Sequence, residues 1–186
     1  MARYRSIKLL FPGLIFFAFS GCALFDSSRN ATTPAVSGVT VNNAIVVVPE
    51  NERLLHAFKA EGFNADISAK GVVVYIPGLF FEVGSSELMF EAKEKIRFLA
   101  TVVQRDFVAN RKLAVMGHTD STGDASLNMA LSRRRAEKVM DELIFSAVHP
   151  DRIDISWFGE TRPVASNKNA SGRSRNRRVE FVVLNL

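Results

Sequence analysis

The chain has 186 residues, of which 47% are hydrophobic and 23% are charged, so it is long and apolar enough for one domain of ordinary size with extensions. This composition excludes a chain that is disordered throughout. The formal net charge is +5, but three of the positive charges lie within the first eight residues, in a segment that we expect to be removed. The remaining +2 is too small to indicate a nucleic-acid partner, and we expect none.

The N-terminal segment has the layout of an export signal. Three cations in the first eight residues precede a short apolar run at residues 9–18. The next residues, Phe19-Ser20-Gly21-Cys22, resemble a bacterial lipobox, in which the cysteine is lipidated and becomes the new N-terminus. We therefore expect residues 1–21 to be a lipoprotein signal peptide and Cys22 to be acylated.

The residue after Cys22 bears on the destination of the protein. It is Ala23 rather than Asp, which in the sorting rule of many Gram-negative bacteria implies the outer membrane. We expect a lipid-anchored protein of the outer membrane whose domain faces the periplasm. The alternative is an uncleaved inner-membrane anchor of the stator type. Against it, the stretch 9–25 is shorter than the ~20 residues of a membrane-spanning helix. It also carries no acidic residue, whereas the membrane spans of stator proteins carry one.

Two short segments separate Cys22 from the domain. Residues 22–49 are expected to be the lipidated cysteine and a flexible tether, because residues 26–43 are rich in Ser, Thr, Asn, Ala and Gly and show neither helical nor strand periodicity. Residues 50–70 are expected to form a short helix and a loop, with Leu54, Leu55 and Phe58 as the apolar stripe of the helix. Packing of this stripe on the domain is the expected arrangement. An exposed stripe would instead favour binding of a protein partner.

Residues 71–186 are expected to form the domain. Strands are predicted at 71–76, 113–117, 151–158 and 176–183, with a short resumption of the first strand at 79–81. Helical spacing of apolar residues predicts one helix that begins near Ser85 or Ser86 and a second that is capped by Asp124 or Ser126. The segment 164–175 is predicted to be a loop.

The order strand–helix–strand–helix–strand–strand predicts the fold class. Helical crossovers imply parallel pairing of the early strands and a mixed sheet overall. We therefore expect an α+β sandwich with a βαβαββ core, in which helices cover a mixed four-stranded sheet. The order of the strands does not follow from the sequence.

The most informative stretch is Gly117-His118-Thr119-Asp120 with the helix that follows it. Asp120 comes just after the end of a predicted strand. Asn128 and Arg135 are seven positions apart, so they point to the same side of the helix, two turns from each other. A pocket lined by a carboxylate and a guanidinium suits a zwitterion. Asp120 would pair with the ammonium of the ligand, and Arg135 would bind its carboxylate. The free N–H groups at the start of the helix add attraction for the same anion.

The string Asn128-x-x-Leu131-Ser132-x-x-Arg135-Ala136-x-x-Val139 after Gly-His-Thr-Asp resembles the peptidoglycan-binding domain at the C-terminus of OmpA-type proteins, of peptidoglycan-associated lipoproteins and of stator proteins. The resemblance extends over residues 74–183. It implies that Asp120 and Arg135 hold the diaminopimelate of the wall's peptide stem and that Asn128 belongs to the same site. It also places Arg177 near this ligand. The expected partner is thus peptidoglycan, bound without a covalent bond.

Other classes of function fit less well. His118, Asp120 and Ser121 are too close in sequence to converge as a catalytic triad, and the histidines lack metal-ligand spacing, so we expect no enzyme, no metal and no cofactor. His118 is expected to be structural, with its ring hydrogen-bonded under the turn. The remaining alternative is a periplasmic signalling lipoprotein of the OmpA type that sequesters a protein partner.

Overall fold

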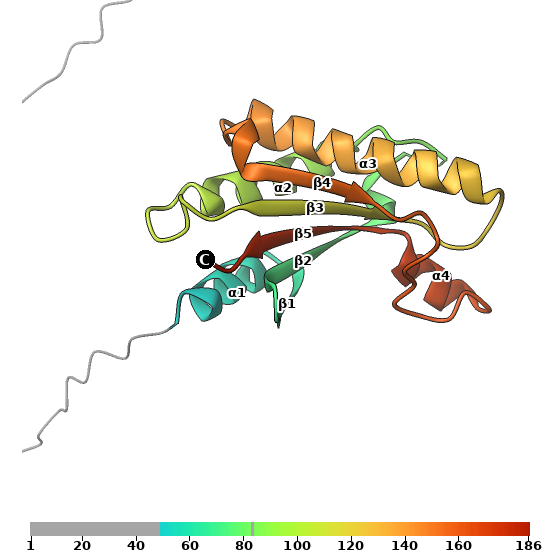
Figure 1. Ribbon diagram of the computed structural model, residues 1–186, viewed down its shortest axis with the longest axis horizontal. Coiled ribbons are helices and arrows are strands. Elements are labelled where there is room, and N and C mark those ends of the chain that lie inside the picture. Colours follow the sequence, from blue (N-terminus) through green and yellow to red (C-terminus); the bar gives the residue numbers. More distant parts are fainter. Residues whose placement is uncertain (1–48, 83) are drawn as a thin grey trace, which may run out of the picture. The chain divides into compact units, whose positions relative to one another are not determined.

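The computed structural model describes residues 49–82 and 84–186. The predictions for the signal peptide, Cys22 and the tether lie outside these residues, apart from Pro49 at the tether's end. The described chain forms a sheet and four α-helices (Figure 1). In chain order the elements are α1 Glu50–Ala60, β1 Asn64–Ser68, β2 Gly71–Pro77, a 3-10 turn Gly78–Phe80, α2 Phe90–Val103, β3 Leu113–His118, α3 Ala125–Phe145, a second 3-10 turn Pro150–Arg152, β4 Ile153–Trp157, α4 Ala170–Asn176 and β5 Arg178–Leu184.

The sheet is mixed, as expected, but it has five strands rather than four, in the order β1-β2-β5-β3-β4. The additional strand is β1, which lies in the segment that was predicted to be a loop. Only Ala65 of this edge strand is buried, so it lacks the apolar alternation that marks a half-buried strand. The early strands β2 and β3 do run in the same direction, but β5 lies between them and is antiparallel to both. Direct parallel pairing joins β3 to β4.

Three helices pack on one face of the sheet. Residues of α1, α2 and α3 share a core with inward residues of β2, β5 and β3, and Figure 1 shows β3 and β4 passing in front of α2. The largest buried members include Phe58, Ile96, Leu99, Leu143 and Phe181. The spacing in the sequence therefore identified the buried face of α2, and that of α3 as far as Leu143.

Helix α1 belongs to this core. Leu54 and Phe58 are fully buried, and the ring of Phe58 meets that of Phe181 edge to face, with 6.5 Å between centroids. The expected packing of the apolar stripe is confirmed. This burial leaves the helix no free apolar stripe for a protein partner.

Local details differ from the predictions at three places. Leu79 and Phe80 form a 3-10 turn instead of resuming the strand, and Phe81 makes an isolated bridge with Leu88. No side chain caps α2, because its N-cap residue is Met89 rather than Ser85 or Ser86.

The predicted loop before β5 contains the short helix α4. Asn169 is the N-cap residue of this helix, and its side chain accepts a hydrogen bond from Gly172 N–H.

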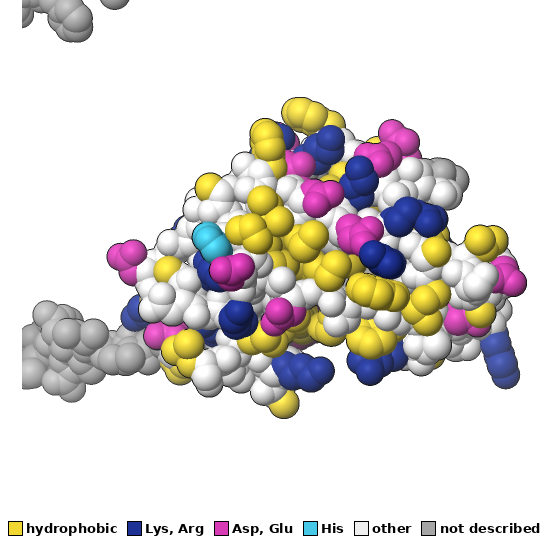
Figure 2. Space-filling view, turned by 45° about the horizontal axis from the view of Figure 1, so that its top comes forward, with side chains coloured by type: hydrophobic (Ala, Val, Ile, Leu, Met, Phe, Trp, Pro, Cys, Tyr) yellow, Lys and Arg dark blue, Asp and Glu magenta, His cyan; other side chains and the backbone are white. Residues whose placement is uncertain are grey.

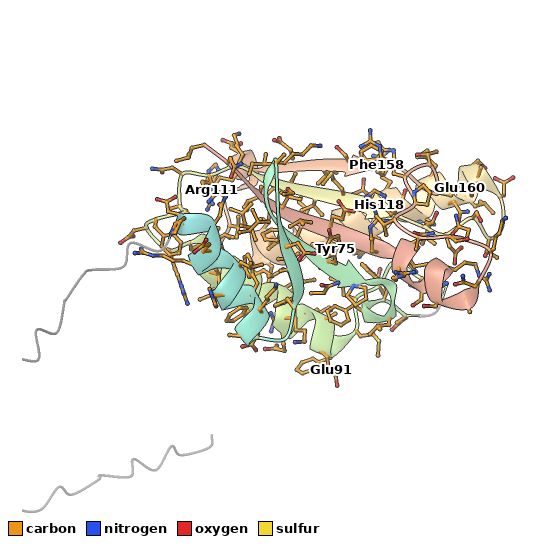
Figure 3. The ribbon with its side chains drawn as sticks, turned by 90° about the horizontal axis from the view of Figure 1, so that it is seen from below. Tyr75, Glu91, Arg111, His118, Phe158 and Glu160 are labelled. Atoms are coloured by element: carbon orange, nitrogen blue, oxygen red, sulfur yellow. The ribbon has the colours of Figure 1, made fainter. Side chains whose placement is uncertain are left out.

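The opposite face of the sheet carries no helix of the described core. Figure 3 places His118 and Phe158 side by side, on the side of the molecule away from Glu91 of α2. Figure 2 shows hydrophobic side chains in a band across one face of the molecule, with charged side chains on both sides of it.

Among the helices of residues 49–82 and 84–186, none combines the length and the apolar character needed to cross a membrane.

Candidate functional site

The end of β3, the turn after it and the start of α3 form the frame of the site. Strand β3 ends at His118, and Asp124 caps α3 as predicted, accepting hydrogen bonds from the N–H groups of Ser126 (2.7 Å) and Leu127 (3.2 Å). The strand and the helix approach closely at Gly117, where a Cβ would lie 2.7 Å from the carbonyl carbon of Ser132. This contact leaves room for no side chain, and it sets Asp120 at a fixed position relative to α3.

Asp120 is buried and ionised. One carboxylate oxygen accepts a hydrogen bond from Thr122 N–H at 2.9 Å, and the other pairs with Nη1 of Arg177 at 2.7 Å. Burial by itself would raise the pKa of Asp120, but the hydrogen bonds from Arg177 and Thr122 outweigh it and hold this pKa below its ordinary value. The site therefore presents a negative charge at neutral pH.

Arg135 is a buried cation without a carboxylate of its own. It is 5% exposed, its Nε donates to the carbonyl of Ser85 at 3.1 Å, and its guanidinium lies 4.9 Å from the centre of the Phe81 ring. Burial lowers the pKa of Arg135, and the charge of Arg177 lowers it further, while Asp120 acts in the opposite direction. Within the described chain, no carboxylate lies within 4 Å of this guanidinium. A buried charge that lacks a counter-charge is costly, so the site is suited to an anion from outside.

Asn128 holds the turn together from α3. Its Nδ2 lies 3.3 Å from the carbonyl oxygen of Asp120 and 3.1 Å from that of Thr122, and it donates to Oε2 of Glu160 at 2.8 Å. Sequence reasoning assigned no role to Glu160. The sequence feature that could have indicated Glu160 is its place in the Gly159-Glu160 turn. Two further hydrogen bonds join this turn to the site: Thr119 N–H donates to the Gly159 carbonyl, and Gly159 N–H donates to Ser132 Oγ.

Arg177 reaches the site from the end of α4. Its side chain is 43% exposed, and its backbone carbonyl accepts a hydrogen bond from Gly78 N–H at 2.7 Å. The structure thus brings both Asn128 and Arg177 into contact with Asp120. It sets Arg135 close enough for the charges of Asp120 and Arg177 to affect its pKa. The four residues predicted for the site lie around one place.

His118 lies on the other side of the strand end. Its ring is buried and stacks on Phe158 with 5.3 Å between centroids, but in the described structure neither ring nitrogen has a hydrogen-bond partner, so the expected bond under the turn is wrong. Glu180 is 3.7 Å from Nε2, yet the same carboxylate oxygen is held by Arg178 at 2.6 Å. Burial, with the charges of Arg178 and Arg162, lowers the pKa of His118 to about 3. The ring is neutral at physiological pH and acts in packing.

No metal-binding cluster of three or more His, Cys, Asp or Glu side chains occurs among residues 49–82 and 84–186. The site is instead a pair of opposite charges at the end of a strand, where the carboxylate and the guanidinium sit on different elements.

Comparison with known proteins decides the family. The model described as "OmpA family" matches residues 80–177, just over half of the chain, and this range contains Asp120, Asn128, Arg135 and Arg177. The chain belongs to the OmpA family. Its α+β fold with a mixed sheet is that of OmpA C-terminal-like structures.

Individual relatives of this OmpA-family chain support the assignment. It is 37% identical over 120 residues to "Outer membrane protein A" of Bordetella avium, covering 64% of this chain and 60% of that protein. It is 34% identical over 119 residues to a "Peptidoglycan-associated lipoprotein" of Pseudomonas putida, covering 63% of this chain and 69% of that protein. The chain thus spans less than two thirds of the length of the Bordetella relative.

Two solved structures show the same fold. The cell wall anchor of the T6SS from Pseudomonas aeruginosa superposes with a TM-score of 0.62 at 29% identity, over 73% of this OmpA-family chain and 96% of that one. The periplasmic domain of Helicobacter pylori MotB gives a TM-score of 0.59 at 26% identity, over 67% of this chain and 83% of that one.

Proposed function

We propose that this chain is a non-enzymatic outer-membrane lipoprotein that binds peptidoglycan through the diaminopimelate of the peptide stem and so tethers the envelope to the cell wall. The observation that carries the proposal is the buried Arg135, which has no carboxylate within 4 Å in the described chain, beside the ionised Asp120. The names of the Pseudomonas putida lipoprotein and of the Pseudomonas aeruginosa cell wall anchor support the same reading.

The two charges match the two ends of a zwitterion. Diaminopimelate carries an ammonium and a carboxylate on one carbon. The ammonium approaches Asp120, whose carboxylate has lone pairs beyond those used by Thr122 and Arg177. The carboxylate meets Arg135, whose planar guanidinium can donate two parallel hydrogen bonds. Asn128 then serves by holding the turn that carries Asp120, and the half-exposed Arg177 adds a second cation at the rim.

Removal of either charge tests the site. We expect Asp120→Ala and Arg135→Ala each to weaken binding to purified sacculi about ten- to a hundredfold, because charge-assisted hydrogen bonds contribute roughly 1.5–3 kcal/mol each. Arg135→Lys is expected to recover only part of the loss, because an ammonium cannot donate the planar pair of bonds. The measurement is co-sedimentation of the whole chain, held in detergent, with sacculi over a range of protein concentrations.

Arg134→Ala is the matched control, since Arg134 is the exposed neighbour of Arg135 on the same helix. Circular dichroism shows whether each variant is folded. Folded Asp120→Ala and Arg135→Ala proteins that sediment as the wild type does would refute the assignment of the site.

The lipid anchor is a separate prediction. We expect intact-mass analysis of the protein extracted from membranes to show a chain that begins at an acylated Cys22, because of the cations, the apolar run and the Gly21-Cys22 junction. A full-length chain without acyl groups would instead support an uncleaved anchor of the stator type, an alternative with which the structural similarity to MotB agrees.

The signalling alternative has less support. It depended on an exposed apolar helix in residues 50–63, and the structure packs Leu54 and Phe58 of this helix into the core. A protein partner in the periplasm would have to bind elsewhere on the domain.

A further inference from the structure

A groove of about 580 Å³ lies beside the candidate site. Its walls come from separate parts of the chain: the residues around the start of β1, the end of β2 with the turn after it, α2, and the C-terminal end of α4 with the start of β5. The residues that matter most for its chemistry are Phe63, Leu79, Phe80, Lys95, Arg175 and Arg177.

The groove and the candidate site share a wall. Arg177 lines the groove and at the same time pairs with Asp120 at 2.7 Å. The turn that contributes Leu79 and Phe80 is fastened to the backbone of Arg177 by the Gly78 N–H, and it leads directly to Phe81, whose ring lies under the guanidinium of Arg135. A ligand held between Asp120 and Arg135 can therefore continue past Arg177 into the groove.

The lining of the groove is apolar and carries cations that have no carboxylate partner among the described residues. Leu79 is 69% exposed in its wall, which is unusual for a large apolar side chain, and Phe80 is partly exposed beside it. Lys95 lies 5.1 Å from the centre of the Phe63 ring, and its Nζ donates a hydrogen bond to the backbone carbonyl of Glu61 at 3.0 Å. Neither Lys95 nor Arg175 has a carboxylate within 4 Å in the described chain. Arg178 also lines the groove, but it is paired with Glu180. Among the lining residues, Asp66 is the one carboxylate, so positive charge predominates.

We propose that this groove is a second subsite, which binds the anionic peptide segment that continues from the bound diaminopimelate. The inference rests on the proposed function. A peptide with a carboxylate and small apolar groups is complementary to an apolar wall that carries two cations without a carboxylate partner in the described chain. Phe63, Asn64, Asp66, Tyr75 and Pro77 all precede residues 80–177, so much of the subsite comes from outside the matched family region.

Two ligands of different length separate this subsite from the first site. We expect a muramyl tripeptide that ends in diaminopimelate to bind the wild-type chain more tightly than free diaminopimelate does. The double variant Lys95→Gln/Arg175→Gln should bind the muramyl tripeptide about five- to tenfold more weakly, since two partly exposed ion pairs are lost, and should bind free diaminopimelate as the wild type does. The measurement is calorimetric titration of the whole chain in detergent.

Matched variants make the outcomes distinct. Lys93→Gln removes a cation two positions earlier on α2, and therefore from another side of the helix and outside the groove, so it should leave both affinities unchanged. Asp120→Ala should weaken both ligands. The subsite is refuted if the double variant binds the muramyl tripeptide with the affinity of the wild type. It is also refuted if the affinities for the muramyl tripeptide and for free diaminopimelate fall by the same factor. In both cases binding of the ligands by the wild type still supports the first site. If neither ligand binds the wild type, the proposed function itself fails.

Discussion

Replacement of Gly117 by alanine is expected to lower the free energy of unfolding by about 3 kcal/mol or more. The added Cβ would overlap the carbonyl oxygen of Ser132 and lie 2.7 Å from its carbonyl carbon, and both are backbone atoms of α3. Backbone atoms inside a helix cannot move aside as the tip of a flexible side chain can, so the strand and the helix must separate. The measurement is urea unfolding followed by circular dichroism.

The same substitution should also impair the site. Gly117 is where β3 meets α3, and the separation of these elements moves Asp120 away from Arg135. Gly123→Ala is the control, because no atom outside its neighbours lies within 4 Å of the added Cβ. Its φ of +91° still disfavours alanine, at a cost of about 1–2 kcal/mol. Equal losses of stability in the two variants would contradict the close approach at Gly117.

Acid should destabilise the fold through His118, well above the pH at which carboxylates titrate. In the unfolded chain the imidazole takes up a proton below about pH 6.5, whereas in the folded chain the pKa is about 3. Between these values the unfolded state binds one more proton, so the free energy of unfolding falls by about 1.4 kcal/mol per pH unit as the pH is lowered. We expect a loss of about 2.5 kcal/mol between pH 7 and pH 4.5.

Comparison with His118→Phe assigns this loss to the ring. Phenylalanine keeps an aromatic ring against Phe158 and has no proton to gain, so the variant should show a much flatter dependence between pH 4.5 and pH 7. The depressed pKa of Asp120 and that of Asp124 add destabilisation only at lower pH, because the unfolded carboxyl group titrates near 3.8. Parallel stability curves for the two proteins would show that His118 is not the group responsible.

Helical periodicity explains how much of the site could be predicted. Asn128 and Arg135 are two turns apart on one helix, and Asp120 follows directly from the strand before it, so local geometry relates all three. The turn residues and Asp124 likewise act on backbone groups within a few positions, and the cap forms as expected. What lies within one strand–turn–helix unit depends on bond geometry that the sequence specifies directly.

Contacts between distant segments could not be predicted in this way. Arg177 was expected near the ligand from resemblance alone, and its pairing with Asp120 joins residues 57 positions apart. Glu160 reaches Asn128 only because Gly159 is tied to both β3 and α3. No spacing rule relates such residues, because their distance depends on how the strands are ordered in the sheet.

The sequence by itself determined the class of the fold from the order of its elements, and the buried faces of α2 and α3 from a period of about 3.6 residues. It also indicated the pair of charges that defines the candidate site, because Asp120 follows a strand directly and helical spacing sets Arg135 on one side of α3. The tertiary structure alone decided the order β1-β2-β5-β3-β4, the strand β1 and the groove between the start of β1, the turn after β2 and α4. Edge strand β1 buries one side chain, and the groove joins segments more than 100 positions apart, from Phe63 to Arg175. Their formation depends on packing against the rest of the chain, which leaves no periodic pattern in the sequence.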